Sequence, residues 1–375
     1  MSLGDVQSQF SGIILKSLQR AELSFCDNAA SFLQTGFWGR FKARFGWEAF
    51  AFRAEWENKV QPLLVMRRSL AAGFSLAYIP WGPELPAPGT TAVLGAADLP
   101  AIDEFRGAAL TELAMALKTL LPRDTVFIRF DPPWYSEGPD TAPPRIPPPF
   151  CRSGADIQAP DTVLLDLKAP MESIMEQMKP KWRYNARLAL KKGVTVRRAT
   201  AEEVDAFYSL LEETGWRDGI AIHSIEYYKT LLEESKTETN SPLQINLYLA
   251  EHEGDVLAGI VTLFRGKEAV YLYGASSEKK RSLMAPYALQ IKAIEDAKET
   301  GCEVYDLFGI PPDDDPSHPM AGLYRFKTGF GGRIIHRPGS WDYPCRPLLY
   351  RVFQNAEALR KNLRTLKKRI LKQHK

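Results

Sequence analysis

A proline-rich stretch divides the chain near its middle. Residues 132–149, PPWYSEGPDTAPPRIPPP, contain eight of the 27 prolines in this 375-residue sequence. Proline has a fixed φ and no backbone N–H, so it disfavours both helix interiors and central strands. The stretch therefore predicts a long loop or linker, and a chain of this length is expected to form two domains around it.

The same alternation of strand-like and helix-like patterns occurs on both sides of this stretch. Before it, apolar periodicity predicts a helix over 28–46, strands over 61–69 and 74–82, a helix over 99–121 and a strand over 125–131. After it, the predicted elements are strand 162–167, helix 170–192, strand 195–199, helix 201–215, a strand meander over 246–276, helix 285–301 and strand 303–309. This order predicts the α+β class, with two related modules and mixed, mostly antiparallel sheets.

Composition excludes several classes of protein. Apolar residues make up 45% and charged residues 25%, as in ordinary folded globular proteins. Cys26, Cys151, Cys302 and Cys345 have no paired spacing, which disfavours a disulfide framework or a zinc site. No apolar run reaches the roughly 18 residues of a membrane span, and the N-terminus lacks a signal-peptide pattern. We therefore expect a cytoplasmic protein.

Positive charge is concentrated in two blocks, although the net charge is only +3. Residues 351–375 carry nine Lys or Arg against one Glu, and residues 179–198 carry eight without an acid. In the second block Arg183, Arg187 and Lys191 recur at helical spacing, a stripe suited to an RNA backbone. The alternative is that both blocks are solvated helix faces.

The segment RFKTGFGG, residues 325–332, combines cations, aromatics and glycines. It is not a phosphate loop of the Walker type, because its lysine precedes the glycines. Nor does the acid-rich PPDDDPSHP, residues 311–319, predict a metal site, since four prolines make a rigid exposed turn more consistent than a ligand cage. The chain has no Gly-x-Ser-x-Gly elbow, so covalent catalysis is unsupported, and we expect neither a metal nor a cofactor.

The second half has the strand and helix order of an N-acetyltransferase-type domain. Acyl-CoA enzymes of that fold place a glycine-rich loop at a helix N-terminus, where backbone amides bind pyrophosphate. The matching segment here, SSEKKRSLMAPYALQ over 276–290, contains no glycine, and Pro286 removes one backbone donor. A coenzyme A donor is therefore disfavoured, although the fold is retained.

Eight motifs in order resemble one family. They are GFWGRFKARFGW, YIPWGP, TVLLDL with KWRYNARLALKKGV, WRDG, YLYGAS with APYALQ, YDLFGI, YRFKTGFGG and PLLYR. Together they resemble the FemABX family, the peptidoglycan bridge enzymes that use aminoacyl-tRNA. The resemblance implies a first acetyltransferase-like domain over 1–160 plus 338–375, which binds the precursor, and a second over 161–337 on the aminoacyl-tRNA side. It also implies transfer of an amino acid from tRNA onto the stem peptide of a cell-wall precursor. Only a short stretch separates Ala201 from Gln244, so the coiled-coil arm of some members is not expected.

The resemblance also assigns roles to individual residues. Lys42 and Arg217 match the pair that holds the diphosphate of the precursor, which is either UDP-linked or lipid-linked. Tyr271 and Tyr273 match tyrosines of the substrate channel. The remaining matches are Phe326 and Lys327 with the Phe-Lys pair at the aminoacyl-tRNA end, and Asp131 with an acidic residue near the acceptor peptide.

Chemistry supports a catalytic lysine beside the glycines. Attack on an activated ester develops an oxyanion, and a fixed cation stabilises it in the transition state. Lys327 suits this task or contact with terminal tRNA phosphates, with Phe326 and Tyr271 beside it, and the following glycines would let a large substrate approach the backbone. The alternative for Lys327 is a surface turn, and for Tyr271 and Tyr273 it is an ordinary core face.

The C-terminal segment predicts a basic amphipathic helix. Apolar residues from Val352 to Ile370 recur every three or four positions among cations. Such a helix can lie on the inner membrane face, bind tRNA or pack on the first domain. Besides the tRNA-dependent aminoacyltransferase, two other functions stay open: an acyl-CoA N-acyltransferase and a nucleic-acid-binding protein without catalysis.

Overall fold

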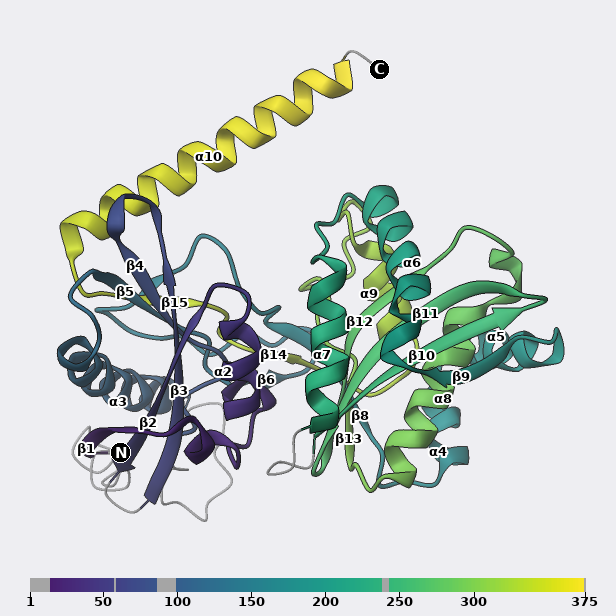
Figure 1. Ribbon diagram of the computed structural model, residues 1–375, viewed down its shortest axis with the longest axis horizontal. Helices are drawn as coiled ribbons and strands as arrows, with labels where there is room; N and C mark the ends of the chain where they lie inside the picture. Colours follow the sequence, from purple (N-terminus) through teal and green to yellow (C-terminus); the bar gives the residue numbers. More distant parts are fainter. Residues whose placement is uncertain (1–13, 57–58, 86–98, 238–242, 374–375) are drawn as a thin grey trace. The chain divides into compact units, whose positions relative to one another are not determined.

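The chain forms two compact units, each with its own sheet (Figure 1). The computed structural model describes residues 14–56, 59–85, 99–237 and 243–373. Unit 1 is formed from the described parts of 1–135, 143–158 and 337–375, and unit 2 from those of 136–142 and 159–336. Both sheets are mixed and carry helices on their faces, so the predicted α+β class is confirmed.

Unit 1 is built on a seven-stranded sheet within the described residues. Across the sheet the strands are β1 (Leu15–Ala21), β2 (Glu48–Trp56), β3 (Lys59–Ser69), β4 (Ser75–Ile79), β5 (Thr125–Phe130), β15 (Trp341–Pro344) and β7 (Cys151–Arg152). Neighbours are antiparallel except β4 and β5, which are parallel. A parallel pair needs a crossover connection, and α3 (Leu99–Leu120) provides it.

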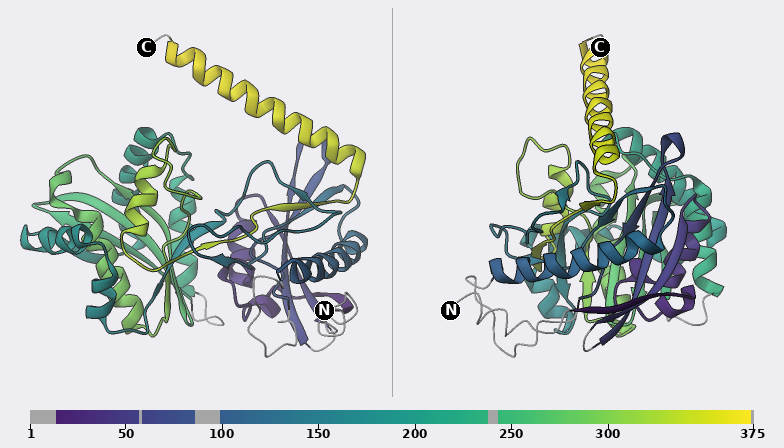
Figure 2. Two further views of the ribbon diagram at one scale, coloured as in Figure 1. Left: turned by 180° about the vertical axis from the view of Figure 1, so that it is seen from behind. Right: turned by 90° about the vertical axis from the view of Figure 1, so that its left-hand side faces the viewer.

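Helices cover both faces of this sheet (Figures 1 and 2). The apolar side of α3, including Leu110, Leu113 and Leu117, packs on alternate residues of β2, β3 and β5 to form a buried core. Helix α2 (Gly36–Ala43) lies on β2 and β3. Gly39 allows this close packing, since a Cβ added there would lie only 2.9 Å from the Leu64 side chain. Short 3-10 helices occupy Leu23–Cys26, Phe32–Gln34 and Ala71–Gly73.

Unit 2 is built on an eight-stranded sheet of the described residues. The strands are β6 (Ser136–Glu137), β14 (Arg333–His336), β8 (Asp161–Asp166), β13 (Val304–Asp306), β12 (Glu268–Ser276), β11 (Asp255–Arg265), β10 (Leu243–His252) and β9 (Thr195–Ala199). Here too one pair, β12 and β13, is parallel, and α8 (Ala285–Glu299) connects its strands. The acetyltransferase-like order thus occurs in both units.

The two faces of the unit 2 sheet are covered by different helices (Figure 1). Helices α4 (Met171–Gln177), α5 (Pro180–Lys191) and α8 share a buried core with one face. Helices α6 (Val204–Asp218) and α7 (Ile225–Thr237) cover the other, where Gly259 lets the Phe207 ring approach the strand. The remaining helices are α9 (Ala321–Thr328) and 3-10 turns at Ala201–Glu203 and Arg281–Leu283. Between Ala201 and Gln244, the residues that the structure describes form α6 and α7 and no coiled-coil arm.

Several elements differ from the sequence prediction. The predicted helix 170–192 is two helices, because the chain is extended at Met178 and Lys179 before Pro180 starts α5. Residues 325–328, to which the sequence analysis assigned no secondary structure, end helix α9. The elements that were not predicted are β1, β2, β6, β7, β14, β15, α7 and α9. Residues 136–142, assigned above to the first domain, belong to unit 2 because β6 pairs with β14.

The C-terminal part of the chain completes unit 1. Strand β15 pairs with both β5 and β7. Asp342 on β15 receives two hydrogen bonds from the buried Arg129 guanidinium, at 2.7 and 2.8 Å, and a third from the Tyr350 hydroxyl at 2.9 Å. Tyr350 belongs to α10 (Pro347–Gln373), one continuous helix (Figure 2). Within the described residues, none of the helices has the length and apolar character to cross a membrane.

Candidate functional site

A cleft of about 880 Å³ opens in unit 2. Its walls come from the end of α6, strands β11 and β12, the loop 276–284, the start of α8 and the segment 319–327. It brings together five residues that the sequence analysis proposed as functional: Arg217, Tyr271, Tyr273, Phe326 and Lys327. These residues span more than a hundred positions in the chain, so only the fold of unit 2 makes them neighbours.

Lys327 lies in the last turn of α9 and is only 6% exposed. Its Nζ donates hydrogen bonds to the carbonyls of Phe308 and Gly309 at 2.7 and 3.0 Å, and lies 5.0 Å from the centre of the Tyr271 ring. Burial lowers the pKa of Lys327 to about 7, against the opposing charge of Asp306. Lys327 is thus a buried cation that titrates near neutral pH, and the alternative of a surface turn is wrong.

One of the two carbonyls that accept hydrogen bonds from Lys327 belongs to Phe308, whose backbone is strained. Phe308 has φ +56, in the left-handed region that a bulky side chain rarely adopts. The fully buried Asp306 stabilises this turn, because its carboxylate accepts hydrogen bonds from Phe308 N at 2.7 Å and Thr162 Oγ1 at 2.5 Å. Asp306 therefore supports Lys327 through the backbone as well as through its charge. The sequence analysis assigned no role to this residue, although it lies in the motif YDLFGI, residues 305–310.

Tyr271 and Tyr273 lie at an irregularity of β12. The register with β11 shifts between Val261, which faces Tyr273, and Thr262, which faces Tyr271, so Leu272 is an extra residue. The Tyr271 ring folds over Gly274, where an added Cβ would lie 1.8 Å from the Tyr271 hydroxyl. Burial raises the pKa of both tyrosines, which keeps their hydroxyls protonated. Both side chains line the cleft.

Tyr273 belongs to an aromatic cluster that the sequence analysis did not identify. Its hydroxyl lies 3.1 Å from that of Tyr227, whose pKa burial raises to about 12. The His223 ring stacks on Tyr227 at 3.9 Å, and Tyr228 meets Tyr273 edge to face at 5.2 Å. His223 and Tyr228 line the cleft. Residues 223–228 lie outside the motifs that carry the resemblance, so the sequence analysis did not mark them as part of a site.

Phe326 packs within a second aromatic group. Its ring meets Tyr287 and Phe330 at 5.3 and 5.1 Å, and its carbonyl accepts a hydrogen bond from the Trp182 indole at 2.8 Å. This group fixes the end of α9 against α5 and α8. The position of Phe326 therefore depends on three separate elements of unit 2.

The glycines after Lys327 serve the protein's own packing, so the interpretation that they give a substrate access is wrong. A Cβ at Gly329 would lie 2.1 Å from the Trp182 ring. Gly331 and Gly332 have φ +87 and +83, and a Cβ there would lie 2.8 Å from the Gln177 carbonyl oxygen and 2.5 Å from that of Leu164. Close approach of the chain to itself explains why these positions are glycine.

Arg217 lines the cleft near the C-terminal end of α6, and acidic groups already hold it. Its guanidinium makes two hydrogen bonds to Asp218, at 2.8 and 2.9 Å, and further ones at 3.0 Å to Glu278 and to the Ser276 carbonyl. Hydrogen bonding to Asp218 raises the pKa of Arg217. A phosphate ligand would have to compete with these carboxylates.

The loop before α8 forms another wall of the cleft. It contains no glycine, yet Lys280 and Met284 adopt φ +48 and +58. The Lys280 ammonium is held by Asp255 at 3.0 Å and Glu253 at 3.1 Å. These ion pairs fix the loop with side chains, where a glycine-rich loop would present backbone amides.

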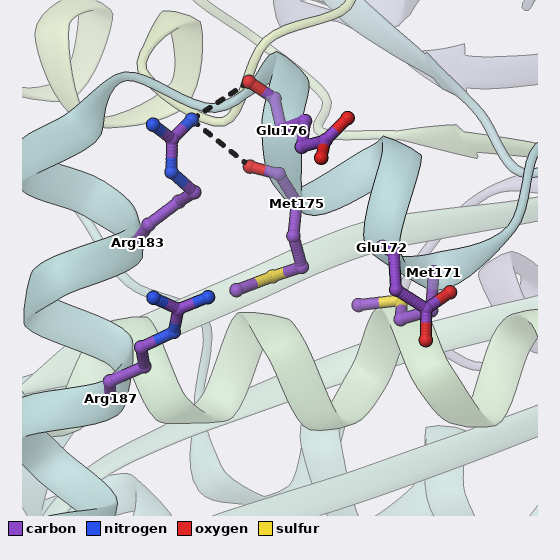
Figure 3. Close-up of a pocket in the computed structure, with 6 residues that line it drawn as sticks. All are labelled: Met171, Glu172, Met175, Glu176, Arg183 and Arg187. Carbon is purple, nitrogen blue, oxygen red and sulfur yellow. Dashed lines mark hydrogen bonds between the residues drawn. The ribbon is translucent and has the colours of Figure 1, made fainter.

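The proposed RNA-binding stripe lies on α5. Figure 3 shows Arg183 and Arg187 facing a pocket of about 480 Å³ that α4 closes with Met171, Glu172, Met175 and Glu176. Arg183 caps the end of α4, because it donates hydrogen bonds to the carbonyls of Glu176 at 2.8 Å and Met178 at 2.6 Å. Arg187 and Lys191 are exposed. In the folded chain, Glu172 and Glu176 of α4 therefore lie near the stripe, although residues 179–198 contain no acid. Binding of RNA by the stripe stays a prediction.

Lys42 lies in unit 1, on α2. Its ammonium lies 5.6 Å from the centre of the Trp38 ring, one turn away on the same helix face. Burial, with the nearby charge of Arg68, lowers the pKa of Lys42 to about 8. An anionic ligand beside it would stabilise the charged form.

Asp131, also in unit 1, is buried with 3% exposure. Its carboxylate accepts hydrogen bonds from the hydroxyls of Tyr78, at 2.5 Å, and Ser340, and from Gln158 N at 3.4 Å. Burial raises the pKa of Asp131 to about 6, against these hydrogen bonds. These contacts give Asp131 a structural part in unit 1, and its predicted contact with the acceptor is untested.

The acid-rich segment 311–319 is a set of turns. Asp315 accepts hydrogen bonds from Ser317 N and Oγ, both at 2.8 Å, and its own N–H donates to Asp313. Among the described residues, no group of three or more His, Cys, Asp or Glu is placed to hold a metal ion.

Fold and cleft place the chain among proteins made of two acetyltransferase-like units. The crystal structure of FemX covers 90% of this chain and 100% of its own, with a TM-score of 0.69 and 19% identity, which shows a shared fold. The profile of the FemAB family matches residues 151–243 and 235–358, more than half of the sequence. The chain belongs to the FemAB family, and the resemblance found in its motifs is confirmed.

Curated relatives match part of the chain. The Lipid II:glycine glycyltransferase of Staphylococcus saprophyticus is 25% identical over 256 residues, 53% of this chain. That of Staphylococcus aureus strain NCTC 8325 is 24% identical over 263 residues, 54% of this chain. In both cases the match spans 62% of the relative's own length.

Proposed function

We propose that this protein is an aminoacyltransferase that moves an amino acid from aminoacyl-tRNA onto the stem peptide of a peptidoglycan precursor. The buried Lys327 at the wall of the unit 2 cleft, beside Tyr271 and Phe326, is the observation that carries the proposal. Membership of the FemAB family supports it, as do the relatives named Lipid II:glycine glycyltransferase. Because aminoacyl-tRNA is a cytoplasmic molecule, we propose that the protein acts there.

In the proposed reaction, the acceptor amine of the stem peptide attacks the carbonyl carbon of the aminoacyl ester. A C–N bond forms, negative charge develops on the carbonyl oxygen, and the C–O bond to the tRNA ribose then breaks. The ribose oxygen leaves as a hydroxyl, with the proton that the amine loses. Proton transfer by way of the substrate's own phosphate or hydroxyl is one route that needs no protein base.

Lys327 is proposed to stabilise the oxyanion. Two of its ammonium N–H groups donate to the carbonyls of Phe308 and Gly309, and the third can donate to a substrate oxygen. Its low solvent exposure strengthens that interaction because little water competes for it. Phe326 and Tyr271 are proposed to hold the aminoacyl end beside it.

Lys42, Arg217, Tyr273 and Asp131 are proposed to bind the precursor. Burial lowers the pKa of Lys42 to about 8, and a diphosphate beside it would favour the protonated, positively charged form. Arg217 would exchange part of its contact with Asp218 and Glu278 for a phosphate oxygen. Arg183, Arg187 and Lys191 on α5 are proposed to contact the tRNA backbone. UDP-linked and lipid-linked precursors share the diphosphate and the peptide, so either form fits these roles.

A transfer assay tests the proposal. The protein is incubated with tRNAs charged with labelled amino acids and with either a UDP-linked or a lipid-linked muramyl pentapeptide. We expect label to move from tRNA to the peptide with the wild-type protein, and not with Lys327→Met. Transfer from labelled acetyl-CoA alone would establish the acyl-CoA alternative, and RNA binding without any transfer would establish the non-catalytic one.

A further inference from the structure

Helix α10 attaches to unit 1 through one side of its first turns. The rings of Tyr350 and Phe353 pack on Phe127 of β5, at 5.2 and 4.9 Å. The Tyr350 hydroxyl donates to the buried Asp342, and the Gln354 amide donates to Tyr350 at 3.1 Å. These contacts anchor the helix and define the side that faces the sheet.

The opposite side of α10 is apolar and exposed. Leu348, Val352 and Leu359 are 78%, 65% and 60% exposed. At about 100° per residue, these positions fall within an arc of about 40°, on the other side of the helix from Tyr350 and Phe353. By the same spacing, Leu363, Leu366 and Ile370 occupy positions that continue this line along the helix. We call these six positions the α10 stripe.

Positive charge occupies the remaining circumference of the helix. Residues 351–375 contain nine Lys or Arg and a single Glu. At helical spacing, the positions of those cations from Arg351 to Lys372 fall outside the α10 stripe. A partner that covers the stripe must therefore have both an apolar region that buries the six apolar residues and anionic groups that pair with the cations.

We propose that α10 binds the surface of an anionic phospholipid bilayer, with the α10 stripe at the boundary between headgroups and acyl chains and the cations among the lipid phosphates. A bilayer satisfies both requirements at once. A second copy of the helix would cover the stripe but bring two sets of cations together, with only one Glu from each copy to pair them. An RNA backbone would pair the cations but leave the stripe in water.

This inference goes beyond the proposed reaction and does not depend on it. If the acceptor is lipid-linked, however, a membrane-bound α10 confines the enzyme to the surface on which that acceptor lies. Restriction to this surface raises the effective concentration of the acceptor without any new contact at the cleft. The reaction on a water-soluble precursor would be indifferent to it.

Vesicle co-sedimentation of the full-length protein tests the proposal. The vesicles are phosphatidylcholine alone, or phosphatidylcholine with three-tenths phosphatidylglycerol. We expect binding to the mixed vesicles only, weakening as salt is raised. Leu359→Gln with Leu366→Gln should reduce the partition coefficient at least about tenfold. Lys367→Gln with Lys368→Gln should reduce it by about fivefold for each cation removed. Thr365→Gln, at a position among the cations, is the matched control and should bind like wild type.

Three results would overturn the proposal. They are equal binding to both kinds of vesicle or to neither, loss of self-association in the Leu359/Leu366 variant with unchanged vesicle binding, and loss of tRNA binding in the lysine variant with unchanged vesicle binding. Thermal unfolding verifies that the variants fold. Transfer to a UDP-linked acceptor, measured in parallel, should be unchanged in all of them. Failure of that reaction in the wild type would count against the proposed function and not against membrane binding.

Discussion

The two units place a buried carboxylate at the same point of the same topology and use it differently. In both, a strand follows the crossover helix and lies parallel to its neighbour, and an aspartate stands at its end: Asp131 after β5 and Asp306 at the end of β13. In unit 1 the acid is held by the hydroxyls of Tyr78 and Ser340. In unit 2 it supports the turn and the charge of Lys327. The repeated fold supplies a buried acid in each unit, and the neighbouring side chains decide whether it serves stability or a site.

The largest effect is expected from the lysine of the cleft. Lys327→Met should lower kcat by roughly 10²–10³-fold, as for loss of one oxyanion donor. It should lower the melting temperature only modestly, because removal of a buried ammonium partly offsets the loss of its two hydrogen bonds to backbone carbonyls. Transfer kinetics and thermal unfolding measure the two effects. Lys42→Met in unit 1 is the matched variant, and we expect it to raise the KM for the precursor with a smaller change in kcat. Equal losses of kcat in both variants would remove the functional difference between the units.

Asp131→Asn tests the unit 1 carboxylate through its pH dependence. The folded-state pKa of Asp131 is raised to about 6, so protonation is easier in the folded than in the unfolded chain. Its contribution to stability is therefore fully present below about pH 4 and is lost as pH rises through 6, about 3 kcal/mol in all. Urea unfolding at pH 4 and pH 7 should show this loss in wild type and not in the variant. As Asp131 is also proposed to bind the precursor, the KM for the precursor should rise in the folded variant; an unchanged KM would limit Asp131 to its structural part in unit 1.

Gly329→Ala tests the packing of Trp182 against Gly329 in unit 2. The buried acid of unit 1, Asp131, is instead held by hydroxyls. The added methyl group would clash with Trp182 and displace its hydrogen bond to Phe326, at a cost of about 1–3 kcal/mol. Gly322→Ala is the matched control in helix α9, which ends just before Gly329, and nothing lies within 4 Å of the Cβ added there. It should stabilise the fold by about 0.5–1 kcal/mol. Denaturant midpoints compare the stabilities of the two variants. Similar midpoints would mean that the Trp182 indole moves aside without cost.

The smallest effect is expected from Asp306→Asn. The amide oxygen can still accept from Thr162 and Phe308, but the negative charge near Lys327 is gone. The pKa of Lys327, already lowered to about 7 by burial, should fall further, by up to about one unit. If protonated Lys327 is the active form, the alkaline limb of the pH–rate profile moves to lower pH. A profile that is merely scaled down would mean that Asp306 acts on the fold alone, and Asp131→Asn should leave the limb in place.

Much of the fold was predictable because the spacing of apolar residues along the sequence indicates strands and helices. Alternating apolar residues identified β10 to β12, and the 3.6-residue period identified α3 and α8. Strands β1 and β2 were missed, since their pattern is less regular, with half-exposed residues along both. Helix α9 was not predicted, since it has only eight residues and is bordered by prolines before it and glycines after it.

The candidate site was predictable only as a set of residues. Motif order identified Arg217, Tyr271, Tyr273, Phe326 and Lys327, and the fold places all five around one cleft. Motif order assigned no role to His223, Tyr227 or Asp306, because their contacts with Tyr273, Thr162 and Lys327 form only when the chain folds. The glycines after Lys327 were misinterpreted for the same reason, because Trp182 lies more than a hundred residues away.

The sequence by itself determined the longer periodic strands and helices, that the chain contains two related units, and which family it resembles. These properties follow from side-chain period and motif order along a continuous stretch of chain. Only the tertiary structure decided that Lys327 is buried and titrates near pH 7, that Arg217 is already paired, and that Asp131 is enclosed by hydroxyls. The free energy of a charged group depends on the solvent and the partners around it, and distant segments supply both when the chain folds.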